Sequence, residues 1–396
     1  MSTISSATET SAGISQPAQP QRHLLGSRLL DFWMLGGFSL LLWFPLYLLV
    51  NHSTTLVSLG LALPAAALAL AYAVNHPHFM ASYKLAYTQG HRFVLQNWYQ
   101  LLAVPIAMLC LLAIAYLNWA APISDSGVTR SVNALFAGLG LETRIGNHPN
   151  LGSEILSYFV HFMYFTVGWH YSKQTFGCMM VYAKFDGYPL STLHRNLIRY
   201  GLLSTWWISW LWSQCSAGSF PFYGLTVHRL NLPYVWFQIS YAVVALLFAA
   251  IIVLFVARYM NDRRLPSLNF LVPMVALLTW HVPLFGNPQF FIVIALFHSL
   301  QYFPFVAKVE STRYRKNRGA HTGLRLLGFF GAMAGVGYLA FYFVPESLDA
   351  VSQSLSYTGT PFFMMAIVLF INIHHYFIDN VLWRFKNKEV RDLLFG

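Results

Sequence analysis

The chain has 396 residues, of which 57% are hydrophobic, 17% aromatic and only 9% charged, and its formal net charge is +11. With a mean hydropathy of +0.51, this composition excludes an ordinary water-soluble enzyme and indicates a membrane protein with several spans. An excess of Lys and Arg in such a protein reports which loops face the cytoplasm, so we expect membrane lipids as partners and no nucleic acid. The three cysteines form no C-x-x-C pair, which excludes a disulfide framework and a thiolate metal site.

The predicted elements are almost all apolar helices. Residues 1–22 are small, polar and low in complexity, and we expect a disordered cytoplasmic tail there. Residues 23–396 are expected to form a single all-α transmembrane bundle of about ten helices, each near the ~20 residues that cross the hydrocarbon. The predicted spans are residues 31–50, 56–76, 98–118, 153–181, 198–214, 233–257, 266–285, 288–307, 324–344 and 360–384. The tightest connection falls at Gly286-Asn287-Pro288.

Basic residues predict the orientation of these spans. If the N-terminus is cytoplasmic, 20 of the 24 Lys and Arg residues fall in inner loops or tails. Arg130, Arg144 and Arg229 are the basic residues of the outer loops, and Lys173 lies within a span. This bias predicts that both termini are cytoplasmic and that the protein is an integral, multi-pass membrane protein, in the inner membrane if the source is bacterial.

Six histidines are expected to share one depth in the membrane. They lie within six to 14 residues of the basic residue that closes their span on the cytoplasmic side. At ~1.5 Å per helical residue, these depths agree within about 12 Å, the breadth of one metal or cofactor site. Polar groups at such depth are costly and usually functional. The predicted metal ligands are His76, His78, His170, His298, His374 and His375.

Three of these histidines have a polar companion four residues later, on the same helical face. Gln174 follows His170, Tyr302 follows His298, and Asp379 follows His375. A metal-bound imidazole commonly donates its second N–H to such a group, so we assign Asp379, Gln174 and Tyr302 as candidate catalytic or supporting residues. Asp379 could also be a ligand through oxygen.

The motif His76-Pro77-His78 predicts a break in the second span, because proline disrupts a regular helix. Such a break would let His76 and His78 turn the same way, as an extended H-x-H pair. His161 and His281 are interpreted as structural, because they lie nearer the outer side. Lys173 is expected to extend to the interface, with pairing to Asp379 or to an acidic headgroup as the alternatives.

Histidines with carboxylate and amide support suit iron, with zinc or copper as alternatives, and six of them suit one or two ions or a haem plus a metal. A buried site of this kind would serve a lipid or isoprenoid rather than a water-soluble substrate. The sequence therefore predicts a non-haem iron oxygenase, desaturase or hydroxylase. A cytoplasmic electron donor is an expected partner, with residues 308–325 as its docking surface, although anionic headgroups explain that surface equally.

In architecture and ligand type the chain resembles the membrane desaturase–hydroxylase group, which bears histidines at the cytoplasmic side of a helical bundle. The pair His374-His375 is the part of the sequence that is similar to the histidine boxes of that group. The chain also resembles the bacterial β-carotene cleavage dioxygenases, which hold iron with lone histidines from different helices. Both resemblances imply iron and a lipid-soluble substrate.

Two other functions remain open from the sequence. One is a haem-binding redox protein, in which facing histidines such as His170 and His298 would be the axial ligands. The other is a transporter that uses the histidines and Asp379 as a proton or metal relay. Metal content and the optical spectrum would distinguish the three.

Overall fold

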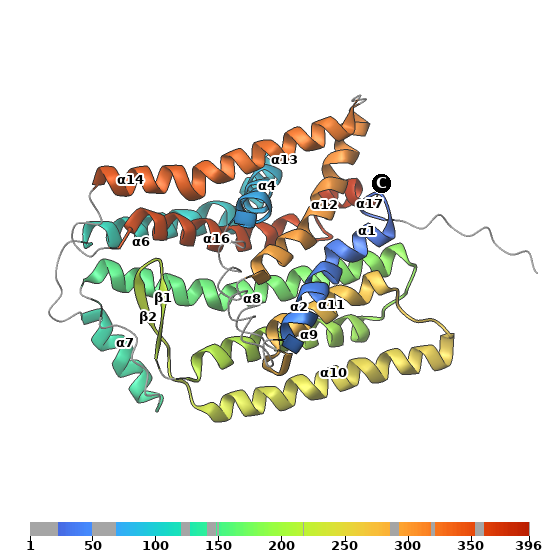
Figure 1. Cartoon of the computed structure of the whole chain (residues 1–396), viewed down its shortest axis with the longest axis horizontal. Helices are drawn as coiled ribbons and strands as arrows, with labels where there is room; N and C mark the ends of the chain where they lie inside the picture. The colour runs from blue at the N-terminus through green and yellow to red at the C-terminus, as the bar shows by residue number, and fades with distance from the viewer. Residues whose placement is uncertain are drawn as a thin grey trace, which may run out of the picture.

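Long helices run side by side along one direction and make up nearly all of the described chain (Figure 1). This computed structural model describes residues 23–49, 69–119, 127–140, 148, 150–216, 218–285, 293–317, 321–352 and 360–395. The predicted tail 1–22, most of the predicted span 56–76 and the turn Gly286-Asn287-Pro288 lie outside these residues. The predicted all-α class is confirmed for the described part of the chain.

The first half of the chain contains α1 (Arg28–Phe32), η1 (Trp33–Gly37), α2 (Phe38–Leu49), η2 (Ala71–Asn75), α4 (His76–Tyr87), α5 (His91–Gln96), η3 (Tyr99–Ala103), α6 (Val104–Leu117), α7 (Gly127–Gly138) and α8 (Leu151–Phe185). The second half contains α9 (Thr192–Gln214), β1 (Ser219–Phe222), β2 (Leu225–His228), α10 (Tyr234–Asp262), α11 (Leu268–His281), η4 (Pro283–Phe285), α12 (Ile294–Lys316), α13 (Thr322–Tyr338), η6 (Leu339–Phe343), α14 (Val344–Ser352), α16 (Phe362–Leu382) and α17 (Lys388–Phe395). β1 and β2 form an antiparallel hairpin in which Phe222 pairs with Leu225.

Four described helical stretches are long and apolar enough to cross a membrane: Tyr99–Leu117, Tyr234–Asp262, Thr322–Ser352 and Phe362–Leu382. Their burial differs sharply, since 67% of the apolar window in Phe362–Leu382 is buried but only 11% of that in Tyr234–Asp262. α16 is therefore an interior helix, whereas α10 presents most of its apolar surface outward. An exposed apolar surface of this length fits lipid rather than water.

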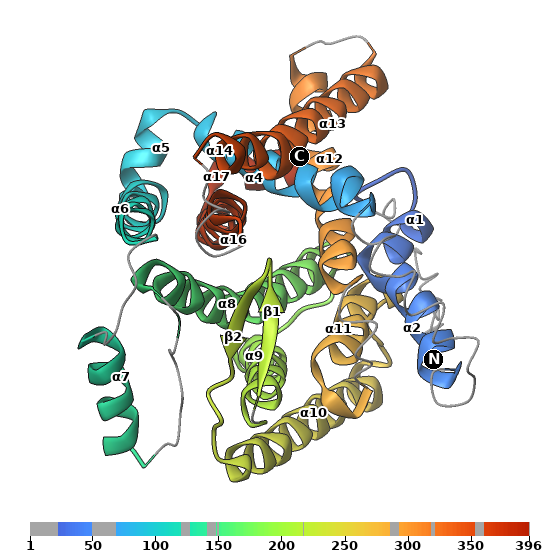
Figure 2. The same cartoon turned by 60° about the vertical axis from the view of Figure 1, so that its left-hand side comes forward.

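α8 and α16 lie at the centre of the bundle. α8 packs against α16 on one side and α9 on the other, and it also contacts α6 and α11 (Figure 2). α16 contacts α4 as well, and α4 contacts α12 and α13. α4, α8, α12 and α16, which carry the predicted histidines, are thus brought together from distant parts of the chain.

Helix η2 continues directly into α4, so the predicted break at Pro77 is wrong. The N–H of His76 donates to the carbonyl of Ala71, five residues earlier, in a π-helical turn, and Pro77 lies in the first turn of α4. This wider turn and the first-turn position accommodate a residue that has no N–H. Side chains two residues apart on a helix point about 200° apart. The expected extended pair, with His76 and His78 turned the same way, is therefore wrong too.

α13 crosses α4 at a glycine. A Cβ on Gly337 would stand 2.8 Å from the Cβ of His76, which is too close for two carbon atoms. Only a residue without a side chain allows the two backbones this approach. The contact fixes the position of α4 just before His78.

Ion pairs join the helices at the end of the bundle where α1 and α17 lie (Figure 1). Arg28 binds Asp186 at 2.6 Å, which ties α1 to the C-terminus of α8. The buried carboxylate of Glu310 on α12 accepts from Lys84 of α4 at 2.8 Å. Arg313 also contacts Glu310, and it reaches Glu389 of α17 at 3.0 Å. The hairpin and α7 lie at the opposite end.

Candidate metal centre

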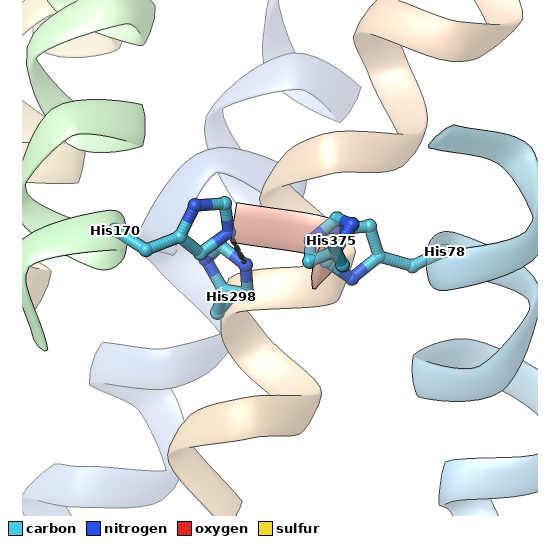
Figure 3. A group of neighbouring side chains, drawn as sticks. All are labelled: His78, His170, His298 and His375. Atoms are coloured by element: carbon cyan, nitrogen blue, oxygen red, sulfur yellow. Dashed lines mark hydrogen bonds between the residues drawn. The ribbon is translucent and has the colours of Figure 1, made fainter. Parts of the chain in front are cut away.

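Four imidazoles meet in the interior of the bundle. His78 of α4, His170 of α8, His298 of α12 and His375 of α16 each offer a ring nitrogen, and these nitrogens all lie within 4.8 Å of one another (Figure 3). All four side chains are buried. Each histidine comes from a different helix, and each ring points into the same small volume. A group of this size and composition could hold a metal ion.

The ring separations suit one shared ion. The Nε2 atoms of His170 and His298 are 3.1 Å apart. Two nitrogens at ~2.1 Å from one metal would then subtend about 95°, as neighbouring ligands do. Axial ligands on opposite sides of a haem iron would lie about 4.2 Å apart on the same bond length, with a flat macrocycle between them. The contact between His170 and His298 therefore favours a bare ion over a haem axial pair.

Several ring nitrogens of the cluster have no hydrogen-bond partner among the described residues. They are His78 Nε2, His298 Nδ1 and both nitrogens of His375. Buried polar atoms are satisfied in the great majority of cases, and each exception requires an explanation. A metal ion would bind the lone pairs of His78 Nε2 and of one His375 nitrogen. Unpaired ring nitrogens also occur on His76, His161 and His374, so those of the cluster fit a metal but do not by themselves mark its position.

Asp379 lies beside the cluster, one helical turn after His375. Its Oδ2 atom is 3.4 Å from His375 Nε2, 3.8 Å from His170 Nε2 and 4.0 Å from His78 Nε2. Its Oδ1 atom accepts a hydrogen bond of 2.8 Å from Ser82 Oγ. One carboxylate oxygen thus faces the imidazoles, and the other is held by the protein.

Tyr302 extends the hydrogen-bond network of Asp379 and Ser82. Its hydroxyl lies 2.5 Å from Ser82 Oγ. Because Ser82 donates to Asp379, we assign the tyrosine as the donor to Ser82. Sequence reasoning placed Tyr302 and Asp379 at this site but missed Ser82. The i+4 spacing from His78 to Ser82, which was applied to the other histidines, would have found it.

Ser299 is a second residue that sequence reasoning missed. Its Oγ atom lies 2.9 Å from His78 Nδ1, and it also contacts Asn75 Oδ1 at 2.8 Å and the carbonyl of Ala295 at 2.9 Å. If His78 donates Nδ1–H to Ser299, the lone pair of Nε2 is left for a metal. No spacing rule points to Ser299, because it approaches His78 from another helix.

Three other predicted residues lie outside the four-histidine group. His76 stacks on Phe341 at 4.3 Å between ring centroids, and His374 Nδ1 lies 2.9 Å from the hydroxyl of Tyr83. Gln174 donates from Nε2 to the backbone carbonyl of His298 at 2.8 Å. Gln174 therefore holds α12 in place rather than binding an imidazole of the cluster.

His161, His281 and Lys173 have neighbours of their own. His161 Nε2 lies 2.9 Å from the carbonyl of His228, and His281 Nδ1 lies 3.2 Å from Thr205 Oγ1. Lys173 donates to Asn380 Oδ1, and its Nζ lies 4.3 Å from the centre of the Trp169 ring. These contacts are consistent with structural roles for the two histidines.

A cavity of 510 Å³ reaches the cluster at His170, Tyr302, Tyr376 and Asp379. It extends between α8, α12 and α16 to α17, where Val390, Arg391, Leu394 and Phe395 contribute to its wall. Cavities of roughly 300–1,000 Å³ hold small organic ligands. His170 and Asp379 therefore adjoin a space that is large enough for a substrate.

Comparison of the chain with protein-family models, with curated proteins and with solved structures gives no match.

Proposed function

We propose that this chain is a multi-pass membrane oxidoreductase that holds one iron ion and oxidises a lipid-soluble substrate with dioxygen. The observation that carries the proposal is the convergence of four buried imidazoles, one of which, His170, lines a cavity. His78, His170, His298 and His375 are the proposed ligands, and Asp379 is the proposed fifth ligand or the carboxylate that orients them. His76 and His374 are left out of the ligand set.

The choice of iron follows from the donor atoms. Imidazole suits iron, copper, zinc and nickel, whereas hard oxygen donors suit magnesium and calcium. Catalytic zinc commonly has three protein ligands and one open position. Four imidazoles with a carboxylate match a metal of higher coordination number better. Four nitrogens within 4.8 Å of one another leave room for one ion among them, provided that the widest separation contracts to about 4.2 Å on binding.

The proposed topology has about ten spans, with both termini in the cytoplasm. The ion pairs of Arg28, Lys84 and Arg313 support it, because they gather basic residues from α1, α4 and α12 with their acidic partners at one end of the bundle. At the other end, Arg229 follows the hairpin and bonds the neutral hydroxyl of Ser216. In a bacterium this topology would correspond to the inner membrane.

In this mechanism the iron, when bound, supplies the site at which dioxygen is activated. The chain contributes the rest. The four helices hold the imidazoles in fixed directions, and the hydrogen bond from Ser82 keeps Oδ1 of Asp379 turned away from the cluster. The cavity holds the substrate chain and excludes water. Hydroxylation would break one C–H bond, place one oxygen atom in the new C–OH group and release the other as water. The two electrons and two protons required would come from a cytoplasmic donor.

The test begins with the metal content and optical spectrum of the full chain purified in detergent. We expect about one iron per chain and no Soret band. The His298→Ala variant should lose the iron, whereas His281→Ala, which removes a buried histidine bonded to Thr205, should retain it. A Soret band, or equal iron in both variants, would overturn the assignment of the centre.

The oxidation step is tested with cells that express the wild type or His298→Ala under ¹⁸O₂. Mass spectrometry of their lipid extracts should show a species with one ¹⁸O, or a species that has lost two hydrogens, only with the wild-type chain. Identical lipid profiles with iron-loaded wild type would remove the oxygenase and leave a metal protein of another kind.

A further inference from the structure

The cavity beside the proposed iron centre has apolar walls but mostly positive charges. Lys173, Arg384, Lys386 and Arg391 line it, whereas Asp379, at the metal end, is the one carboxylate among its described lining residues. Lys173 and Arg391 are half-buried, whereas Arg384 and Lys386 are exposed. A half-buried cation in an apolar wall is unfavourable unless an anion or hydrogen bonds compensate it. Lys173, next to the metal end, therefore calls for a counterpart, and the exposed Arg384 lies within reach of the same ligand.

Two of these cations meet on a single residue. Lys173 donates from Nζ to the side-chain oxygen of Asn380, and Arg384 donates from Nε to the backbone carbonyl of Asn380 at 2.7 Å. Both contacts are to neutral oxygens. Within the described residues, Lys173 and Arg384 form no ion pair, whereas Arg391 has Asp392 at 3.3 Å. An anion that enters the cavity would find two unneutralised cations side by side.

The rest of the wall matches an extended hydrocarbon chain. Aromatic residues of the lining are Trp169, which precedes His170 in the chain, Phe176, Phe305, Trp383 and, on α17, Phe395. Lys173 follows His170 by three residues on α8, which is ~4.5 Å along the helix axis. A headgroup bound at Lys173 would thus lie about one turn from the imidazoles, with apolar wall around the carbon chain attached to it.

We propose that the cavity binds a single-chain amphipathic acid, with its anionic headgroup between Lys173 and Arg384 and its chain along the aromatic wall. The inference rests on the proposed function for the use of this ligand as a substrate, but its binding does not require the metal. The cavity would select ligands that carry one compact anionic group on one long apolar chain. A neutral alcohol or ester of the same chain would leave both cations unpaired.

The experiment measures binding of cis-parinaric acid, a fluorescent single-chain acid, to the full chain in detergent, with its methyl ester as the neutral match. The acid should bind at least about tenfold more tightly than the ester, because hydrogen bonds to charged groups are the stronger ones. Lys173→Gln and Arg384→Gln should each weaken binding of the acid by roughly tenfold or more and leave the ester within about twofold. Lys316→Gln, an exposed lysine at the end of α12, should change neither.

The same titrations on His375→Ala separate the two proposals. Selective binding of the acid by both wild type and His375→Ala supports the cavity assignment even if no iron is found. Equal affinity for acid and ester in an iron-loaded protein would overturn the cavity assignment and leave the metal centre standing. Displacement of the acid by inorganic phosphate alone, at equal concentration, would show a small-anion site and would also overturn the lipid assignment.

Discussion

The Nε2 atoms of His170 and His298 face each other at 3.1 Å, although the residues are 128 positions apart in the chain. Two neutral imidazoles can share such a contact only if one donates and the other accepts. A metal ion instead accepts a lone pair from each ring, and it would do the same for His78 and His375. The arrangement of this pair is therefore the basis for the predictions about metal binding.

Neighbouring histidines on α16 should behave differently when they are replaced. His375→Ala removes a ring that is in the four-histidine group, so we expect loss of most of the bound metal. His374→Ala removes a ring bonded to Tyr83, outside the group, and should leave metal content near that of the wild type. Elemental analysis of both variants after identical purification checks this. Equal loss in both would mean that α16 is rotated from the position described.

Ser299 should affect metal affinity without being a ligand. The Ser299→Ala variant removes the partner of His78 Nδ1, so the tautomer that points its lone pair at the metal is no longer favoured. Losses of roughly 10–100-fold in metal affinity are typical when such a partner is removed. Competition with a chelator of known affinity measures the change. Ser311→Ala is the matched control on the same helix: among the described residues, its hydroxyl contacts the carbonyl of Lys308 and Arg315, so this variant should leave metal affinity unchanged.

Asp379→Asn should weaken the metal site more than Tyr302→Phe does. The first variant keeps the volume of the side chain but removes the negative charge 3.4 Å from His375 Nε2, and we expect at least about a tenfold loss of metal affinity. The second removes only the hydroxyl that donates to Ser82, with a cost to stability of about 1 kcal/mol. The same chelator competition ranks the variants. A larger loss of metal in Tyr302→Phe would contradict the assigned order of the network.

The crossing of α13 and α4 should not tolerate a methyl group. Gly337→Ala would place a carbon atom 2.8 Å from the Cβ of His76, and overpacking of this kind costs about 1–3 kcal/mol. Gly335→Ala, two residues earlier on the same helix, meets nothing within 4 Å and should be neutral or gain up to about 1 kcal/mol from helix propensity. Thermal unfolding of the two variants in detergent gives the comparison. A lower melting temperature for Gly335→Ala than for Gly337→Ala would refute this packing.

The proposed membrane topology can be tested by labelling single cysteines from outside the cell. In a cysteine-free background, Thr226→Cys places a thiol on the exposed face of the hairpin, and Lys388→Cys places one at the start of α17. A maleimide that cannot cross membranes should label the first variant in intact cells and the second only after the cells are broken. The reverse pattern would invert the topology, and labelling of both in intact cells would exclude it.

The sequence could predict that several histidines lie at one level along the bundle, but not the direction in which each ring points. Distances from the basic residues at the ends of the spans placed His78, His170, His298 and His375 at one level, and the structure brings these four together. The same measure also selected His76 and His374, because residues one or two positions apart have nearly the same depth. Which of them faces inward depends on how α4 and α16 are rotated, and tertiary packing decides that rotation. Asp379 carried the missing information, since its i+4 spacing marks the face of His375 rather than that of His374.

The spacing of residues along one helix could not predict contacts between different helices. The partner of Gln174 proved to be the backbone carbonyl of His298 on α12, although the sequence suggested an imidazole on its own helix. The helix continues from η2 into α4 through Pro77 because of a π-helical turn, and no pattern in the sequence predicts that turn. The composition predicted the class correctly because apolar helices of this length require only local information.

The four imidazoles come from α4, α8, α12 and α16, so the interval between the first and the last of them covers most of the chain. During synthesis, the early helices would enter the membrane long before α16 emerges from the ribosome. Until then, the ligand set would lack His375, and His78, His170 and His298 would bind an ion only weakly. If the centre binds a metal as proposed, its loading would be a late event in biogenesis that requires a completely inserted chain.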